Sequence, residues 1–106
     1  MTKFLVKASY TFEGVKGLMK VGGTDRKEAI TKMFRDLGGK LESFYYAFGE
    51  TDVYAIGEMP DTASIAAVVM AINSTGLVSL NTTILIGTEE VDKAAKMTVT
   101  YRKPGS

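Results

Sequence analysis

The sequence contains no cysteine and no histidine among its 106 residues. Without cysteine there is no disulfide and no thiolate nucleophile, and without either residue the usual zinc sites and the common haem ligands are excluded. A Ser-His-Asp relay is excluded for the same reason. We therefore expect no metal site and no cofactor.

An excess of charge of one sign is also missing. Thirteen basic and twelve acidic residues give a net charge of +1, without a block of like charges. This balance predicts no nucleic-acid partner and no attraction to an anionic membrane surface. The longest apolar run is eight residues, Ile65 to Ile72, and only Lys3 precedes the first apolar run, so neither a membrane span nor a signal peptide is expected. We expect a soluble, intracellular and by default cytoplasmic protein.

What is present is enough apolar sequence for one core. With 45% hydrophobic residues in 106, the chain is predicted to form a single domain over residues 1–106.

Hydrophobic periodicity and turn residues predict the order of the elements. The predicted first half is a strand over Lys3–Tyr10, a helix beginning near Thr11, and, after Gly22-Gly23, a second helical segment capped by Thr24 and ended by Gly38-Gly39. The predicted second half is a hairpin of Leu41–Phe48 and Asp52–Met59, a helix over Thr62–Ser74 capped by Asp61, a strand over Leu77–Ile86 and a helix from Thr88 to near Lys96. This order is that of an α+β, ferredoxin-like βαββαβ plait with a four-stranded antiparallel sheet and an extra C-terminal helix.

The hairpin FYYAFGETDVYAI (residues 44–56) carries apolar residues at both odd and even positions. With a turn at Gly49–Thr51, Tyr46 would lie opposite Tyr54, and Glu42 opposite Glu58. The odd positions then face the helices. The even face would hold Phe44, Tyr46, Phe48 and Tyr54, together with Leu5, Lys7 and Ser9 of the first strand and Ser79, Asn81, Thr83 and Leu85 of the fourth. So many exposed aromatic residues predict that another surface packs on this face, and the sheet of a second copy is the simplest candidate. The same mixture of apolar and polar groups describes a ligand cavity.

Lys7 and Ser9 are candidates for orienting a ligand, and Lys7 acts as a base if burial favours its neutral form. An ion pair of Lys7 with Glu42 or Glu58 is the favoured structural alternative.

The phenols of Tyr10, Tyr46 and Tyr54 could donate hydrogen bonds to a carbonyl or quinone-like ligand, with Asn81 and Thr83 as neutral contacts. Packing within a dimer explains the same tyrosines equally well.

Arg26 follows Gly22-Gly23-Thr24 and could offer a guanidinium to an anion at a helix start. A simple helix break is the favoured explanation of the two glycines. Asp52 is predicted to be a turn or capping residue.

Several segments in order resemble one known family: Ala8-Ser9-Tyr10-Thr11, Glu13-Gly14, Lys16-Gly17-Leu18, Gly22-Gly23 with Arg26, Leu37 to Glu42, and Phe48-Gly49 to Asp52. Over residues 3–93 the chain resembles the GYD-domain family, whose signature is Gly, a variable residue, Tyr and Asp. Here the signature reads Gly49-Glu50-Thr51-Asp52, with Thr51 in place of Tyr. The resemblance implies a ferredoxin-like fold in a dimeric α/β barrel built from two sheets, and it does not imply a particular reaction.

Two functions remain open. One is a homodimer that binds a small aromatic or carbonyl-containing molecule in the barrel; if it is an enzyme, the chemistry would resemble a cofactor-independent monooxygenase or isomerase. The other is a non-catalytic assembly module whose sheet face is only an interface between copies. RNA recognition, which the same element order permits, is disfavoured because the strand TDVYAIGE is acidic.

Overall fold

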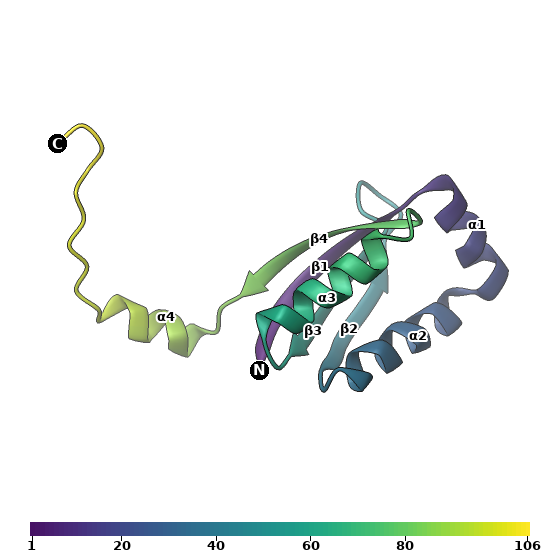
Figure 1. Ribbon diagram of the computed structural model, residues 1–106, viewed down its shortest axis with the longest axis horizontal. Coiled ribbons are helices and arrows are strands. Elements are labelled where there is room, and N and C mark those ends of the chain that lie inside the picture. The colour runs from purple at the N-terminus through teal and green to yellow at the C-terminus, as the bar shows by residue number, and fades with distance from the viewer.

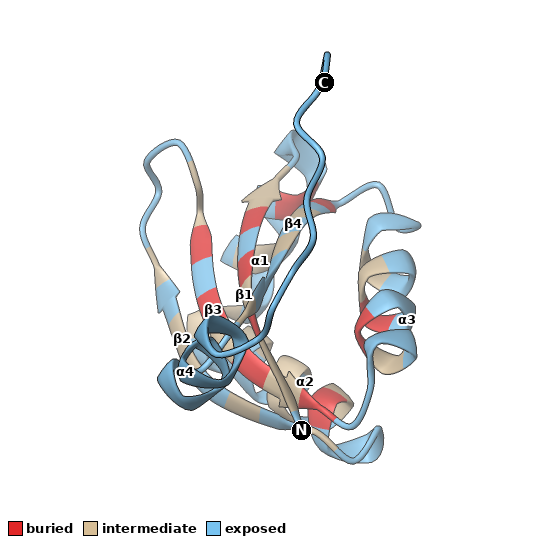
Figure 2. Ribbon diagram, turned by 90° about the vertical axis from the view of Figure 1, so that its left-hand side faces the viewer, coloured by how far each residue is buried: buried red, intermediate tan, exposed pale blue.

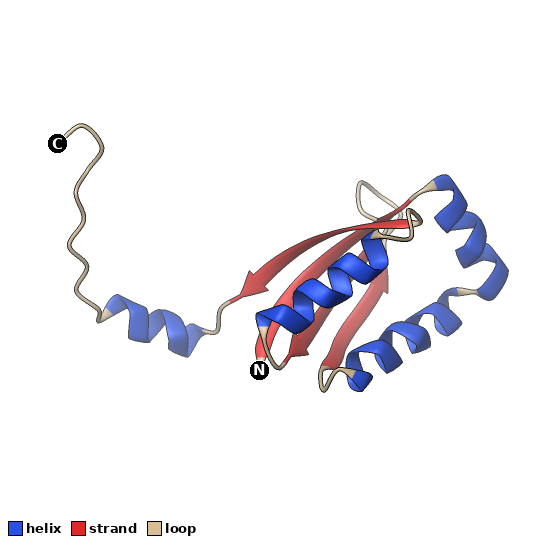
Figure 3. Cartoon of the chain, in the orientation of Figure 1, coloured by secondary structure: helices blue, strands red, loops and turns tan.

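The structure is a computed structural model that describes residues 1–106, and it contains four strands and four helices (Figure 1). In chain order they are β1 (Thr2–Tyr10), α1 (Phe12–Val21), α2 (Gly23–Asp36), β2 (Lys40–Tyr46), β3 (Val53–Met59), α3 (Thr62–Asn73), β4 (Val78–Leu85) and α4 (Thr88–Ala95). The strands form one antiparallel sheet in the order β2-β3-β1-β4. The predicted α+β plait is confirmed, and each predicted element is present (Figure 3).

Local capping explains where the helices begin. The Thr11 hydroxyl accepts a hydrogen bond of 3.2 Å from the N–H of Gly14 and so caps α1. The Asp61 carboxylate caps α3 by accepting from the N–H of Ser64 at 2.8 Å, and this hydrogen bond holds the pKa of Asp61 below its usual value. The predicted cap at Thr24 is wrong. Gly22 occupies that position, because its φ of +88° suits glycine better than threonine.

The core lies between one face of the sheet and helices α2 and α3. Phe4 and Met59 are fully buried, and the ring of Phe34 from α2 stacks on Phe4 with 5.7 Å between the ring centroids. A side chain at Gly57 would collide with the Phe34 ring, so this glycine lets α2 approach β3. α2 packs mainly on β2 and α3 mainly on β4, which are the two outer strands.

Very little of the chain is buried. Only 12 of the 106 residues are buried, although a chain of this size can remove roughly two thirds of its unfolded surface from water. Large apolar side chains remain exposed on α1, on the sheet and in the C-terminal segment; among them are Phe12, Met19, Tyr45, Tyr54, Val91, Met97, Val99 and Tyr101. Several surfaces of the single chain therefore lack an apolar cover.

The C-terminal segment, residues 87–106, extends away from the rest of the molecule (Figure 1). Helix α4 has no buried residue, and Figure 2 shows this segment exposed along its length. Val91 on α4 is 54% exposed and Val99 beyond it is 78% exposed. The segment has an apolar surface but few contacts with its own chain. None of the helices is both long and apolar enough to cross a lipid bilayer.

Candidate functional site

One face of the sheet carries no helix. Phe4, Val6 and Ala8 of β1 are buried under the helices, so the alternate residues Leu5, Lys7 and Ser9 point to the other side. We call that side the open face. Strand pairing adds to it Tyr45 of β2, Tyr54 and Ile56 of β3, and Asn81, Thr83 and Leu85 of β4.

The open face is organised in rows across the strands. Lys7 lies opposite Tyr54 on one side and opposite Asn81 on the other, and Tyr45 lies opposite Tyr54. A cation therefore sits between a pair of phenols and an amide. The next row is more apolar, with Leu5 between Ile56 and Thr83.

The predicted hairpin register is wrong by one residue. A bulge between Leu41 and Ser43 shifts β2, so that Tyr46 lies opposite Val53 and Tyr45 opposite Tyr54. Because alternate residues point to opposite faces, this one extra residue turns Phe44 and Tyr46 toward the helices. The predicted Glu42–Glu58 pair is also absent, since Lys40 lies opposite Glu58.

The hairpin loop differs from the prediction as well. Phe48 lies beyond the end of β2, with a φ of +54°, and its ring stacks on that of Tyr46 with centroids 5.7 Å apart. It is not part of a flat aromatic surface on the open face.

Lys7 does not form the predicted ion pair. Glu42 is bound instead by Lys3, whose Nζ lies 2.9 Å from the Glu42 carboxylate. The hydrogen bond to Glu42 raises the pKa of Lys3 above its ordinary value. Lys7 takes part in none of the three ion pairs of the chain, so its ammonium group is free to contact a ligand.

The predicted site residues divide between the two sides of the sheet. Five share the open face: Lys7, Ser9, Tyr54, Asn81 and Thr83. The other three, Tyr10, Arg26 and Tyr46, gather on the helical side. The Tyr46 hydroxyl donates to the carbonyl oxygen of Gly23 at 3.1 Å. Burial and the neighbouring Tyr10 raise the pKa of Tyr46 to about 12, and the Arg26 guanidinium opposes that rise.

The two glycines before Arg26 have a structural reason. Gly22 adopts a positive φ between α1 and α2, and a Cβ at Gly23 would lie 3.0 Å from the Tyr46 ring. They let the chain turn, as the helix-break interpretation expected, and they also let Tyr46 approach the start of α2.

Sequence reasoning missed two features of these sites. Tyr45 lies on the open face and is 69% exposed, whereas the register assumed from the sequence puts it in the core. The Asp52 carboxylate accepts a hydrogen bond of 2.7 Å from the N–H of Tyr10. The residues of this bond are 42 positions apart, so no local pattern predicts it.

Comparison with known families gives one match. The profile described as the GYD domain matches residues 4–95 of the 106. No curated protein and no solved structure matches the chain. The family match covers all four helices and the sheet except the first two residues of β1, and it includes each of the eight predicted site residues.

Proposed function

The chain belongs to the GYD-domain family, and on this premise we propose that it is a homodimer whose two open faces pack together into an α/β barrel that holds a small organic molecule. The observation that carries the proposal is the row of Tyr45, Tyr54, Lys7 and Asn81 across the middle of the uncovered sheet. A ligand cavity typically joins such apolar walls to a few polar groups.

The exposed apolar groups of the open face support the second copy. Leu5 and Ile56 lie next to each other at the centre of the sheet, and Tyr45 and Tyr54 are 69% and 40% exposed. A continuous apolar surface on a soluble chain is typical of an interface. A twofold axis through this face would cover both copies with the same contact.

The C-terminal segment supports the same assembly. Its apolar side chains Val91, Met97 and Val99 find almost no partner in their own chain. A second copy would offer them a surface, and the segment would then fasten the two chains together.

Lys7 indicates the chemistry of the ligand. Once a second sheet covers the open face, the Lys7 ammonium loses water and needs an acceptor in its place. A carbonyl or carboxylate oxygen meets that need, and the phenols of Tyr45 and Tyr54 can donate to the same molecule or stack with an aromatic ring. The proposed ligand is therefore a small aromatic or carbonyl-containing compound.

The second candidate is an assembly module in which the open face is an interface only. It is favoured by the apolar surface that is exposed on α1 and in residues 87–106. Exposed apolar surface of this extent is typical of proteins that associate with other chains. In this case the tyrosines would pack on each other across the interface, and Lys7 would find its acceptor on the second copy and not on a ligand.

Native mass spectrometry of gently purified protein tests both candidates. A species near twice 11.4 kDa that carries an additional bound mass supports the proposed function. A dimer without bound mass favours the assembly module. A chain that stays monomeric at high micromolar concentration contradicts both.

Variants separate the interface from the ligand. Leu5→Glu places a charge at the centre of the open face and should give monomers. Met70→Glu, a matched change at an exposed site on α3, should leave the dimer intact. Lys7→Met should keep the dimer and lose the bound mass. A dimer that survives Leu5→Glu contradicts face-to-face packing.

A further inference from the structure

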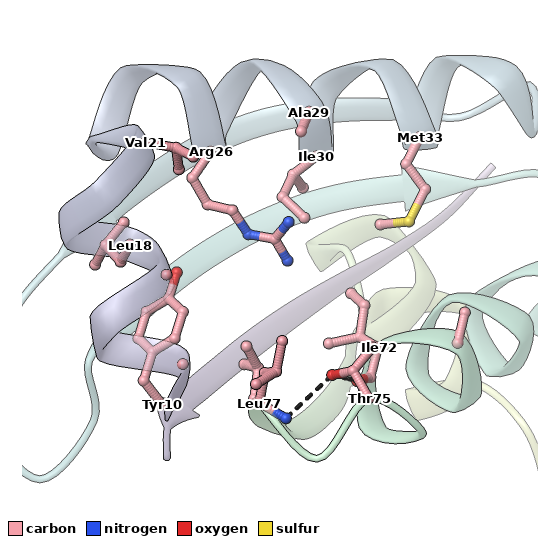
Figure 4. A pocket seen from close by; sticks show the side chains of 14 residues that line it. Tyr10, Leu18, Val21, Arg26, Ala29, Ile30, Met33, Ile72, Thr75 and Leu77 are labelled. Carbon is pink, nitrogen blue, oxygen red and sulfur yellow. Dashed lines mark hydrogen bonds between the residues drawn. The ribbon is translucent and has the colours of Figure 1, made fainter. Parts of the chain in front are cut away.

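The helical side contains a cavity of about 400 Å³ between α1, α2 and the end of α3, which we call the interhelical cavity (Figure 4). It lies where α2 and α3, which pack mainly on the opposite outer strands β2 and β4, make few contacts with each other. Its walls are mostly apolar and include Leu18, Ile30, Met33 and Ile72. Small-molecule sites have volumes in this range and walls of this kind.

Arg26 is the only charged residue among those that line the interhelical cavity. Its side chain extends from α2 into the cavity, with Tyr10 to one side and Ile30 to the other (Figure 4). It forms none of the three ion pairs of the chain. A guanidinium carries five N–H donors and no acceptor, and the partly buried guanidinium of Arg26 has no negatively charged partner.

Polar hydroxyls lie at the same place. Tyr10 lines the cavity at the end of β1, and its backbone is held by Asp52. Tyr10 and Arg26 both act on the Tyr46 phenol, because Tyr10 raises its pKa and the Arg26 guanidinium lowers it. The Tyr46 hydroxyl donates to the carbonyl oxygen of Gly23 and is hydrogen-bonded by Tyr10. Arg26 is left without an acceptor, and Tyr10 can turn its hydroxyl from Tyr46 to a ligand.

We propose that the interhelical cavity binds a small organic monocarboxylate whose carboxylate pairs with Arg26 and Tyr10 and whose aromatic or aliphatic body packs on the apolar walls. A planar guanidinium matches a carboxylate with two parallel hydrogen bonds. One cation balances one negative charge. A phosphate monoester, with a charge of about −1.5 to −2 near neutral pH, would leave charge without a partner among apolar side chains.

This site is separate from the one on the open face. Arg26 and Tyr10 act on the helical side, whereas Lys7 points to the other side of the sheet. The inference therefore goes beyond the proposed function and does not depend on dimer formation.

The test is titration of the full chain with 4-phenylbutyrate, followed by two-dimensional ¹H–¹⁵N NMR. We expect saturable shifts at residues of α1, α2 and the end of α3. The uncharged 4-phenylbutanamide, which keeps the apolar body, should bind about 10-fold more weakly or worse, because a charge-assisted pair is lost.

Variants at adjacent positions complete the test. Arg26→Met removes the cation and keeps a long apolar side chain, and it should weaken 4-phenylbutyrate binding by about 10- to 100-fold. Lys27→Met removes the same charge from the next, exposed residue and should change the dissociation constant less than about twofold. Arg26→Gln serves as a second variant if the spectrum of Arg26→Met shows loss of the fold.

Three results would overturn the inference. The carboxylate and the amide could bind equally well, Arg26→Met could bind like the unchanged protein, or the shifts could fall on Lys7 and Tyr54 of the open face. The inference is also overturned if 4-phenylbutyrate does not bind at all. That would be the result if a segment of a second copy filled the cavity.

Discussion

The carboxylate of Asp52 accepts a hydrogen bond of 2.7 Å from the backbone N–H of Tyr10. Asp52 also donates its own N–H to the carbonyl oxygen of Ala8 at 2.9 Å, so it fastens the beginning of β3 to the end of β1 at two points. Asp52 closes the signature Gly49-Glu50-Thr51-Asp52, and Tyr10 lines the interhelical cavity. The signature aspartate thus holds one wall of that cavity.

Replacing Asp52 by Ala should destabilise the fold, because the N–H of Tyr10 loses a charged acceptor in a partly buried position. The expected loss in the free energy of unfolding is about 1.5–3 kcal/mol, measured by urea denaturation. Asp92→Ala, in exposed α4, is the control and should change stability less than about 0.5 kcal/mol. Equal stability of the two variants would show that the Asp52 bond contributes nothing.

Replacing either of two glycines on α1 by alanine should change the stability of the fold, in opposite directions for the two positions. A Cβ at Gly14 would collide with the carbonyl oxygen of Leu77, whereas a Cβ at Gly17 would meet no atom within 4 Å. Gly14→Ala should therefore lower the free energy of unfolding by about 1–3 kcal/mol, because the added methyl group overpacks the site. Gly17→Ala should stabilise by about 0.5–1 kcal/mol, since alanine favours a helix. Thermal unfolding of both variants checks the signs, and a gain from Gly14→Ala would contradict the close packing of α1.

Removal of the Thr82 hydroxyl should stabilise the fold. It lies opposite Val6 on the helical side, and its Oγ1 is buried without a hydrogen-bond partner. Thr82→Val keeps the shape and should raise the free energy of unfolding by about 1 kcal/mol, because the cost of the unpaired hydroxyl disappears. Thr82→Ser keeps the hydroxyl, loses the methyl group and should destabilise. Destabilisation by Thr82→Val in urea titrations would mean that the hydroxyl has a partner.

Stability at alkaline pH should depend on Tyr46. Its pKa in the folded chain is about 12, above the ordinary value of 10.0, because the phenol is buried next to Tyr10. The unfolded chain therefore loses this proton first. The contribution to stability is complete below pH 10 and is lost as the pH rises toward 12.

An ultraviolet absorbance titration follows tyrosine ionisation and should show a component near pH 12. Tyr46→Phe should remove that component, and Tyr45→Phe, on the open face, should retain it. A high-pH component that survives in Tyr46→Phe belongs to another residue and would refute the assignment.

The order of elements could be predicted from the sequence because its signals are local. Asp61 marks the start of α3 through a side chain three residues from its partner, and glycine at position 22 marks the break before α2. The faces of β1, β3 and β4 follow from simple alternation, and this is why the sequence alone predicts that Lys7, Tyr54 and Asn81 share one face.

The tertiary structure decided the rest. A bulge near Glu42 exchanges the faces of Tyr45 and Tyr46. A bulge depends on how the neighbouring strand pairs, so neither its presence nor its position follows from alternation within one strand. The interhelical cavity and the bond between Asp52 and Tyr10 also join segments far apart along the chain. The sequence by itself determined the elements and the residue types available for binding. Only the packing of distant segments decided that Arg26 and Tyr10 gather on one side of the sheet and Lys7 on the other, because that division depends on register and on where each helix settles.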